Sequence, residues 1–178
     1  MIFKELKIKG AYSIDPEKKE DERGFFARVF CNQAFAEKGL AGRVMQTNIS
    51  YSKKAGTVRG MHYQVAPYAE AKLIRCIYGS LYDVIIDLRS DSPTFKQWVG
   101  VKLNASTRQM IYVPEGCAHG FQTLADHTEA LYQVSSSYTP EAERGVRWDD
   151  PAFGIKWPLP VSMISGKDKS HSLFMDNL

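Results

Sequence analysis

Short apolar runs and alternations of apolar and polar residues recur through the middle of this 178-residue chain, separated by Gly, Pro, Asn or Ser. This pattern is typical of many short β-strands. Because the gaps between them hold no long crossover helices, the strands are expected to pair antiparallel in a barrel or jelly roll. The predicted strands span residues 25–30, 43–50, 57–63, 72–78, 80–88, 97–103, 109–113, 118–124 and 129–135.

Helices are expected only at the periphery of this all-β fold. A short helix is predicted to begin at Asn32, whose side chain could cap free amide groups, and to end at Gly39. Segment 140–178 is rich in proline and poor in strand patterns, so it is predicted to pack over the barrel as turns and short helices. Since the sequence contains no linker or repeat, residues 1–178 are predicted to form a single domain.

Composition narrows the class of protein. Hydrophobic residues make up 44% and charged residues 24% of the chain, which excludes a disordered or collagen-like sequence. The net charge is +3 and the basic residues are scattered singly, so no nucleic-acid partner is expected. Without a signal peptide or a run of about 20 apolar residues, the chain is expected to be cytoplasmic and to have no membrane partner. Cys31, Cys76 and Cys117 have no CxxC spacing, which predicts buried free thiols.

Phosphate binding, if present, has to come from side chains. The sequence contains neither a GxxxxGK[ST] loop nor a GxGxxG turn, which argues against nucleotide hydrolysis and dinucleotide binding. Arg23 and Arg59 are candidates because a guanidinium group matches phosphate oxygens in a bidentate manner. The alternative is that both are ordinary surface arginines.

A metal site is not expected. His119 lies in the stretch 114–119 (PEGCAH), which resembles the second half of the metal-binding cupin signature, PxGxxH. The first half should supply an HxH pair and a glutamate, and this chain offers His62 alone. Two histidines fall short of the three protein ligands of a catalytic zinc or iron site.

An unmetallated His62 would instead suit proton transfer, because an imidazole takes up and releases protons near neutral pH. Asp168 could orient the ring, although from its position alone a solvated carboxylate of the tail is the favoured interpretation. Tyr132 lies in the middle of a strand and could donate a proton from inside the barrel, or simply pack there. Lys72 begins its strand and could stabilise an enolate oxygen, or reach out to water.

Further motifs follow one another along nearly the whole chain. They are the stretches 21–26 (DERGFF), 46–48 (QTN), 59–64 (RGMHYQ), 83–89 (DVIIDLR), 92–95 (SPTF) and 113–121 (VPEGCAHGF). In this order and at this spacing they resemble the dTDP-4-dehydrorhamnose 3,5-epimerase family. The resemblance implies a metal-free, cupin-type double-stranded β-helix, that is, a jelly-roll barrel with short peripheral helices.

The same resemblance implies roles for individual residues. His62 would be the general base, Tyr132 the general acid and Asp168 the carboxylate behind the imidazole. Lys72 and His119 would lie against the sugar. The residues that match positions holding the nucleotide-diphosphate sugar are Arg23, Gln46, Asn48, Arg59, Glu143 and Lys167. Arg28, where the family commonly has a glutamate that contacts the nucleotide, is a further candidate for substrate binding.

The implied reaction is inversion at C3, C5 or both of a nucleotide-linked 4-keto-6-deoxyhexose of the dTDP-4-dehydro-6-deoxyglucose type. Both carbons lie next to the C4 ketone, so deprotonation gives an enolate and reprotonation on the opposite face inverts the carbon. No cofactor is expected, because the ketone of the substrate already acidifies these carbons. The resemblance also implies the dTDP-rhamnose pathway and O-antigen biosynthesis. A homodimer is expected, to which residues 1–3 could add an edge strand.

Three alternatives remain open at this stage. The charge reversal at Arg28 makes a C3-epimerase of a CDP-linked 4-keto-6-deoxyglucose the first alternative. The stretch around His119 keeps a metal-dependent cupin as the second. The third is a non-catalytic protein that only binds a sugar nucleotide.

Overall fold

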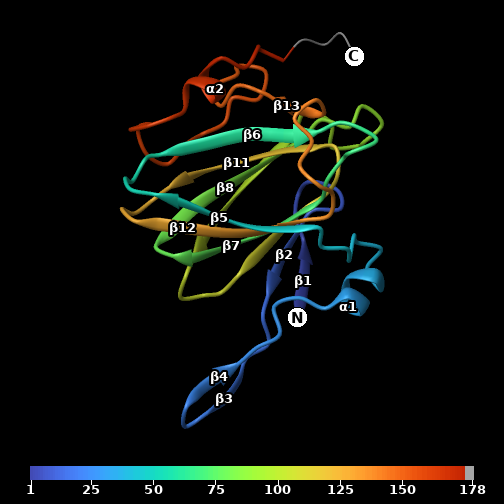
Figure 1. Cartoon of the computed structure of the whole chain (residues 1–178), viewed down its shortest axis with the longest axis vertical. Helices are drawn as coiled ribbons and strands as arrows, with labels where there is room; N and C mark the ends of the chain where they lie inside the picture. Colours follow the sequence, from blue (N-terminus) through green and yellow to red (C-terminus); the bar gives the residue numbers. More distant parts are fainter. Residues whose placement is uncertain (175–178) are drawn as a thin grey trace.

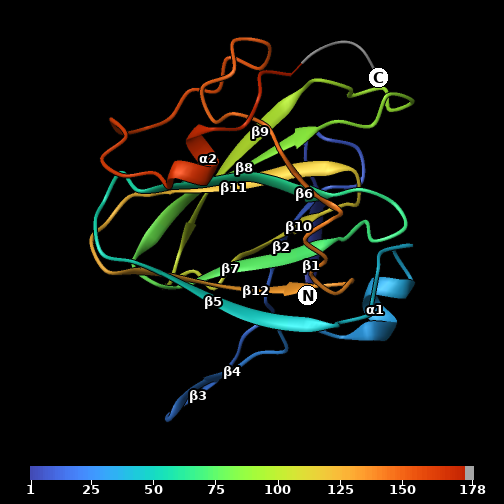
Figure 2. The ribbon, with the colours of Figure 1, turned by 45° about the horizontal axis from the view of Figure 1, so that its top comes forward.

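The computed structural model describes residues 1–174, and two antiparallel sheets packed face to face make up most of it (Figures 1 and 2). The six-stranded sheet has the order β1-β2-β10-β7-β12-β5, with strands Ile2–Glu5, Tyr12–Asp15, Met110–Val113, Lys72–Tyr78, Thr128–Val134 and Gln46–Ser52. The five-stranded sheet has the order β13-β6-β11-β8-β9, with strands Glu143–Gly145, Val58–Gln64, Cys117–Thr123, Ser80–Asp87 and Trp98–Asn104. The all-β jelly-roll prediction is confirmed.

The main core lies between the two sheets. Because successive residues of a strand point to opposite faces, every second position of each barrel strand is directed inward. Ile74 and Cys76 of β7 meet Leu81 and Ile85 of β8 in this way, and all four are buried. At the other end of the barrel the inward positions include polar residues such as His62 and Lys72, and the candidate site lies there.

Short elements cover the outer faces of the sheets. Helix α1 (Asn32–Ala36) places the buried ring of Phe35 on the outer face of the six-stranded sheet, where its centroid lies 5.9 Å from that of Tyr112. The predicted cap is wrong, since Cys31 is the N-cap residue and makes no side-chain cap hydrogen bond. The helix also stops short of Gly39, whose φ of +69° suits the turn that follows.

The C-terminal segment packs on the outer face of the five-stranded sheet. Val146 and Phe153 join Met61 in a second buried cluster there, as expected for a tail that covers the barrel. This tail contains one strand, β13, and one short helix, α2 (Gly166–Lys169). Neither helix in residues 1–174 is long and apolar enough to cross a membrane.

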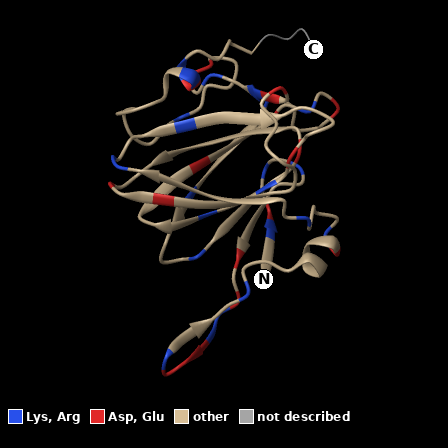
Figure 3. Cartoon of the chain, in the orientation of Figure 1, with Lys and Arg blue, Asp and Glu red and all other residues tan. Residues whose placement is uncertain are grey.

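The predicted strand at 25–30 is largely wrong. Only Gly24–Phe26 forms a strand, β4, and it pairs with β3 (Lys19–Asp21) in a hairpin that projects from the barrel (Figure 1). The next residues leave the strand because Val29 and Phe30 pack instead against the cluster around Phe35. Basic and acidic residues are interspersed over the hairpin and the barrel (Figure 3).

Two of the three cysteines are buried as predicted, whereas Cys31 is partly exposed. Burial raises the pKa of the Cys117 thiol to about 12, so this side chain remains a neutral thiol at physiological pH.

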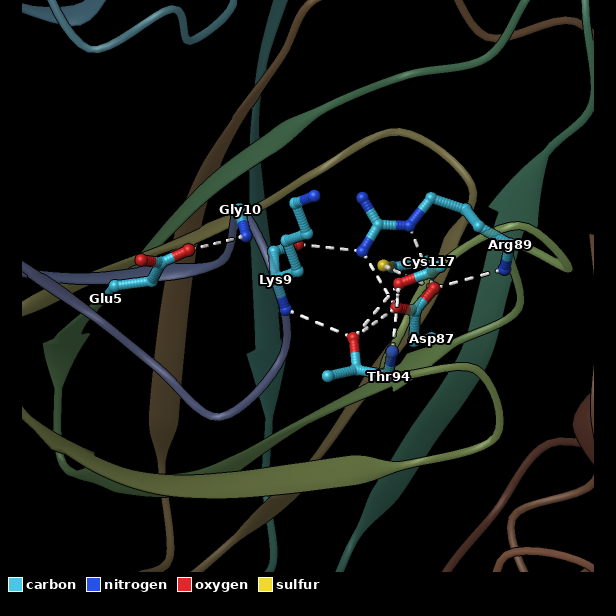
Figure 4. Close-up of polar contacts among 8 residues, drawn as sticks. Glu5, Lys9, Gly10, Asp87, Arg89, Thr94 and Cys117 are labelled. Atoms are coloured by element: carbon cyan, nitrogen blue, oxygen red, sulfur yellow. Dashed lines mark hydrogen bonds and ion pairs between the residues drawn. The ribbon is translucent and has the colours of Figure 1, made fainter.

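Asp87, at the end of β8, holds the loop after that strand (Figure 4). Its carboxylate accepts two hydrogen bonds of 2.8 Å from the Arg89 guanidinium and one of 2.6 Å from the Thr94 hydroxyl. Arg89 in turn donates to the carbonyl oxygen of Lys9 at 2.7 Å, which ties the N-terminal segment to the loop. Burial alone would raise the pKa of Asp87, but these hydrogen bonds outweigh it and lower the pKa to about 2.

We therefore expect Asp87→Asn to destabilise the protein by about 2 kcal/mol at pH 7, with a lower urea midpoint. The folded-state pKa lies below the ordinary value of 3.8. The stabilisation is therefore present above about pH 4 and lost as the pH falls towards 2. The stability difference between the wild type and the variant should shrink over that range.

Asp91→Asn serves as the control, because Asp91 is an exposed carboxylate of the same loop. A stability difference for Asp87→Asn that stays constant from pH 5 to about 2 would contradict the assignment of this pKa.

Candidate active site

Two cavities meet between the sheets. One of about 480 Å³ is lined by Arg59, His119 and the C-terminal segment, among others. The other, of about 340 Å³, is lined by Gln46, Asn48 and Glu143, among others. His62, Lys72 and Tyr132 line both cavities and therefore mark their junction.

The three residues at the junction come from opposite walls. His62 lies on β6 of the five-stranded sheet, whereas Lys72 on β7 and Tyr132 on β12 belong to the six-stranded sheet. Figure 2 shows β6 on one side of the barrel and β7 and β12 on the other. A ring bound at the junction would be flanked by the imidazole and the phenol.

Asp168 orients His62. The Nε2 of His62 lies 2.8 Å from the Oδ1 of Asp168, and the backbone N–H of Gly60 donates to its Oδ2 at 3.1 Å. Burial alone would raise the pKa of Asp168, but the hydrogen bonds from His62 and Gly60 lower it below its ordinary value. The carboxylate is buried, so the alternative of a solvated tail residue is wrong. This pairing leaves the Nδ1 of His62 as the nitrogen that can accept a proton.

The sequence at α2 explains how Asp168 reaches the barrel. Ser165 is the N-cap of α2, and its hydroxyl accepts a hydrogen bond from the backbone N–H of Asp168 at 3.0 Å. Gly60 allows a close approach on the other side, because a Cβ there would lie 2.6 Å from the Cα of Gly120. Its φ of +117° is also one that side chains rarely adopt.

Lys72 and Tyr132 share a carboxylate that the sequence did not reveal. The Nζ of Lys72 lies 3.2 Å from the Oε1 of Glu70, and both side chains are largely buried. Burial raises the pKa of Tyr132, Glu70 raises it further, and Arg59 opposes the shift. The phenol therefore stays protonated at neutral pH and is available as a proton donor. The only sequence feature that points to Glu70 as a site residue is its position two residues before Lys72.

His119 forms a second histidine–carboxylate pair beside the first. Its Nε2 lies 2.8 Å from the Oδ2 of the fully buried Asp83. His119 and His62 are register partners on neighbouring strands β11 and β6, so both rings face the barrel interior. The sequence placed His119 in the site but did not reveal Asp83 as its partner.

The candidate nucleotide-binding residues divide between the two cavities. Glu143 accepts hydrogen bonds from the Lys167 ammonium at 2.6 Å and from the Tyr138 hydroxyl at 2.7 Å. Arg59 in the other cavity donates from Nη2 to the carbonyl oxygen of Tyr51 at 2.8 Å. The structure thus brings Gln46, Asn48, Arg59, His119, Glu143 and Lys167 to the site or its rim.

Arg23 and Arg28 do not reach this site within one chain. Arg23 lies in the turn of the projecting hairpin, where its side chain is 90% exposed and forms an ion pair with Asp21 at 2.6 Å. Arg28 follows the hairpin and lies beside Cys31, where the backbone N–H of Ala34 lowers the pKa of the thiol and the charge of Arg28 lowers it further. Neither arginine lines the two cavities.

His171 is a site residue that the sequence analysis missed. Its ring lies edge-on to that of His62, with centroids 5.8 Å apart. Burial lowers the pKa of His171, and the neighbouring His62 lowers it further. Together with Asp168, the two histidines form a group of three side chains that could bind a metal ion. The sequence analysis had counted only His62 and His119 as possible ligands. The only sequence feature that points to His171 is its position three residues after Asp168.

The fold and the site together define a class of protein. A cupin-type jelly roll with a histidine–carboxylate pair facing a tyrosine across its interior is suited to proton transfer at carbon. The comparisons with known proteins then specify the family. Residues 5–176 match the family model described as dTDP-4-dehydrorhamnose 3,5-epimerase, and the chain belongs to this family. The predicted family and its class of enzyme, an epimerase and hence an isomerase, are confirmed.

Relatives and solved structures agree with this assignment. A dTDP-4-dehydrorhamnose 3,5-epimerase of Shigella flexneri is 42% identical over 163 residues, which cover 91% of this chain and 90% of the relative. The crystal structure of the enzyme of that name from Elizabethkingia anophelis NUHP1 superposes with a TM-score of 0.96 at 37% identity, covering 99% of this chain and 98% of that one.

A third match has a bound ligand. The crystal structure of the epimerase RmlC from Legionella pneumophila Philadelphia 1, in complex with dTDP-4-keto-L-rhamnose, has a TM-score of 0.89 and 36% identity to this chain. The match covers 97% of this chain and 92% of that one.

Glu70 offers a direct test of the electrostatics at Tyr132. Because the Glu70 carboxylate raises the pKa of the phenol, Glu70→Gln should lower that pKa. The shift can be followed by ¹³C NMR of labelled tyrosine, with Tyr132→Phe used to assign the resonance. Glu141→Gln is the control, since Glu141 is exposed and does not line either cavity. An unchanged or raised pKa in Glu70→Gln would contradict the arrangement.

Proposed function

We propose that this chain inverts C3 and C5 of a dTDP-linked 4-keto-6-deoxyhexose of the dTDP-4-dehydro-6-deoxyglucose type. The observation that carries the proposal is the position of His62 and Tyr132 on opposite walls of one pocket. Inversion requires removal of a proton from one face of the ring and delivery to the other, which this arrangement can perform.

Each residue at the junction then has a definite task. The Nδ1 of His62 removes the proton from the carbon next to the ketone, and Asp168 stabilises the imidazolium that forms. The ammonium of Lys72 stabilises the negative charge that develops on the C4 oxygen, and His119 lies on the same side of the pocket as His62 to assist it. The phenol of Tyr132 delivers a proton to the opposite face and becomes a phenolate.

The proton balance predicts exchange with solvent. After one inversion His62 has gained a proton and Tyr132 has lost one, so both have to be reset before the next carbon reacts. The reset proceeds through water, because the His62 side chain is 30% exposed. Protons from the solvent therefore enter the product at each inverted carbon. No redox cofactor takes part, since the ketone of the substrate already acidifies both carbons.

The polar residues around the junction would hold the nucleotide. Arg59 can pair with a phosphate group, and the amides of Gln46 and Asn48 can hydrogen-bond to sugar or base. The Glu143–Lys167 ion pair lies at the rim, where it can exchange partners with an incoming phosphate or hydroxyl group. The binding energy of the nucleotide then holds the reacting carbon near the base.

The names of the relatives favour dTDP over CDP as the nucleotide, and they favour an epimerase over a metal-dependent cupin or a non-catalytic binder. Residues 1–178 would act as one catalytic domain, and the cytoplasmic location remains a prediction.

Incubation with dTDP-4-keto-6-deoxyglucose in deuterated water tests the reaction. We expect deuterium at both C3 and C5 of the product, measured by mass spectrometry and NMR. His62→Ala should reduce the rate of deuterium incorporation at both carbons at least about 10²-fold, because the base is lost. Tyr132→Phe should retain some exchange but lose inversion, since the proton then returns to the face it left.

The exposed residue Tyr78, at the far end of β7, supplies the control variant Tyr78→Phe. Absence of exchange with both the dTDP-linked and the CDP-linked substrate would refute the proposal. Exchange at C3 alone would restrict it to a 3-epimerase.

We also propose a homodimer, in which the projecting hairpin packs on a second copy. Phe26 on the hairpin is 66% exposed, and Ile49 on the outer face of edge strand β5 is 63% exposed. Such exposed apolar residues are typical of interaction surfaces. A partner seated there would also explain why Arg23, a predicted phosphate ligand, points away from the pocket of its own chain. The free edge of β1 is an alternative contact.

Phe26→Asp should convert the dimer into a monomer, measured by light scattering after size-exclusion chromatography. The substitution places a charge in an apolar contact without affecting the barrel core. Tyr78→Asp, which adds the same charge to an exposed aromatic position of the barrel, should remain dimeric. A dimeric Phe26→Asp variant would exclude the hairpin as the contact.

A further inference from the structure

Three imidazoles stand in a row across the five-stranded sheet. His119 and Gly145 are the register partners of His62 on its two sides. Gly145 has no side chain, and the ring of His171 occupies the space that one would fill. A Cβ at Gly145 would lie only 2.2 Å from the Nε2 of His171. His171 therefore stands beside His62 as a cross-strand neighbour would.

His62, Asp168 and His171 converge as metal ligands. One donor atom from each residue lies within 4.8 Å of the other two, and the Nε2 of His62 is already 2.8 Å from Asp168. Zinc binds imidazole nitrogen and carboxylate oxygen at about 2.0–2.2 Å, which places tetrahedral donors roughly 3.3 Å apart. The donors thus have to move together by at most about 1.5 Å. Rotation of the His171 side chain supplies a movement of this size.

His171 also has a ring nitrogen that no other group engages in the described structure. Its Nε2 is buried and finds no hydrogen-bond partner within residues 1–174. A buried polar atom without a partner is unfavourable, so a ligand that engages this ring would be stabilised.

The charges around the group suit a cation. Asp168 contributes one negative charge, and the nearby Lys167 ammonium is neutralised by Glu143 at 2.6 Å. With both imidazoles neutral, the group has a net charge of −1. Two imidazoles and one carboxylate are a ligand set that suits zinc, cobalt and nickel better than magnesium or calcium.

The geometry points to a binding site for a divalent transition metal, formed by His62, Asp168 and His171, in which the ion replaces the proton shared by His62 and Asp168. An ion on the Nε2 of His62 requires the neutral ring to carry its proton on Nδ1. The ring then has no free nitrogen to act as a base, so metal binding and proton transfer exclude each other. This inhibitory consequence rests on the proposed function, whereas the binding itself does not.

Metal binding can be measured without turnover. Calorimetric titration of the full chain with ZnCl₂, and the visible absorption of bound Co²⁺, should show one tetrahedral site in the wild type. His171→Asn should weaken Zn²⁺ binding at least tenfold and remove the Co²⁺ bands. The matched control is His127→Asn, which changes an exposed histidine that contacts Tyr51. Asparagine tolerates the φ of +56° that the backbone has at this position. Absence of stoichiometric binding, or equal affinity in both variants, would overturn the site.

Inhibition of proton transfer by the bound metal is tested with the deuterium-exchange reaction. Zn²⁺ at saturating concentration should reduce exchange to the background rate, EDTA should restore it, and His171→Asn should need at least tenfold more Zn²⁺ for the same effect. Exchange that continues with the site loaded would overturn the inhibition. If the metal-free protein shows no exchange at all, the proposed function fails, while calorimetry and Co²⁺ absorption still decide the metal site.

Discussion

The hydrogen bond between His62 and Asp168 is the contact on which the rest of the site depends. It joins the middle of β6 to helix α2, 106 residues further along the chain. The segment just before α2 lies along the cavity, where Met163 accepts a hydrogen bond from the backbone N–H of Val58 at 2.8 Å and also lines the pocket. The Asp168 carboxylate therefore orients the imidazole, and the segment just before it forms part of the cavity wall.

The pocket exists because the two ends of the barrel interior differ in chemistry. At one end, inward side chains such as Cys76 and Leu81 fill the space between the sheets. At the other end the same inward parity presents Asn48, Lys72 and His119, which do not pack into an apolar core, and cavities with a mixed polar and apolar lining remain there. Packed sheets lie roughly 10 Å apart, so a bound ring can contact both walls at once. The jelly roll thus supplies two opposed walls for the site.

The barrel strands could be predicted because burial on one face enforces alternation over seven or eight residues, as in β7 and β8. The strands β1, β2, β3 and β13 are three or four residues long and contain charged residues, so no apolar pattern appears in them. Strand β10 is equally short but could be predicted because all four of its residues are apolar and buried. His62 could be found because it lies in a barrel strand within the motif 59–64, and Tyr132 because it lies in the middle of a predicted strand and the family resemblance gave it a role. His171 and Glu70 could not, since they follow no periodicity and only tertiary packing brings them to the pocket.

Two histidine–carboxylate pairs share this pocket, and their solvent contact distinguishes them. The His119 side chain is 10% exposed and that of Asp83 is fully buried, whereas the His62 side chain is 30% exposed. A base that turns over has to return its proton to water, and the more accessible ring does so more readily. A buried imidazole held by a buried carboxylate is instead suited to donate a hydrogen bond of fixed direction. Within the proposed mechanism, the difference in burial favours His62 for proton transfer and His119 for stabilising the developing negative charge.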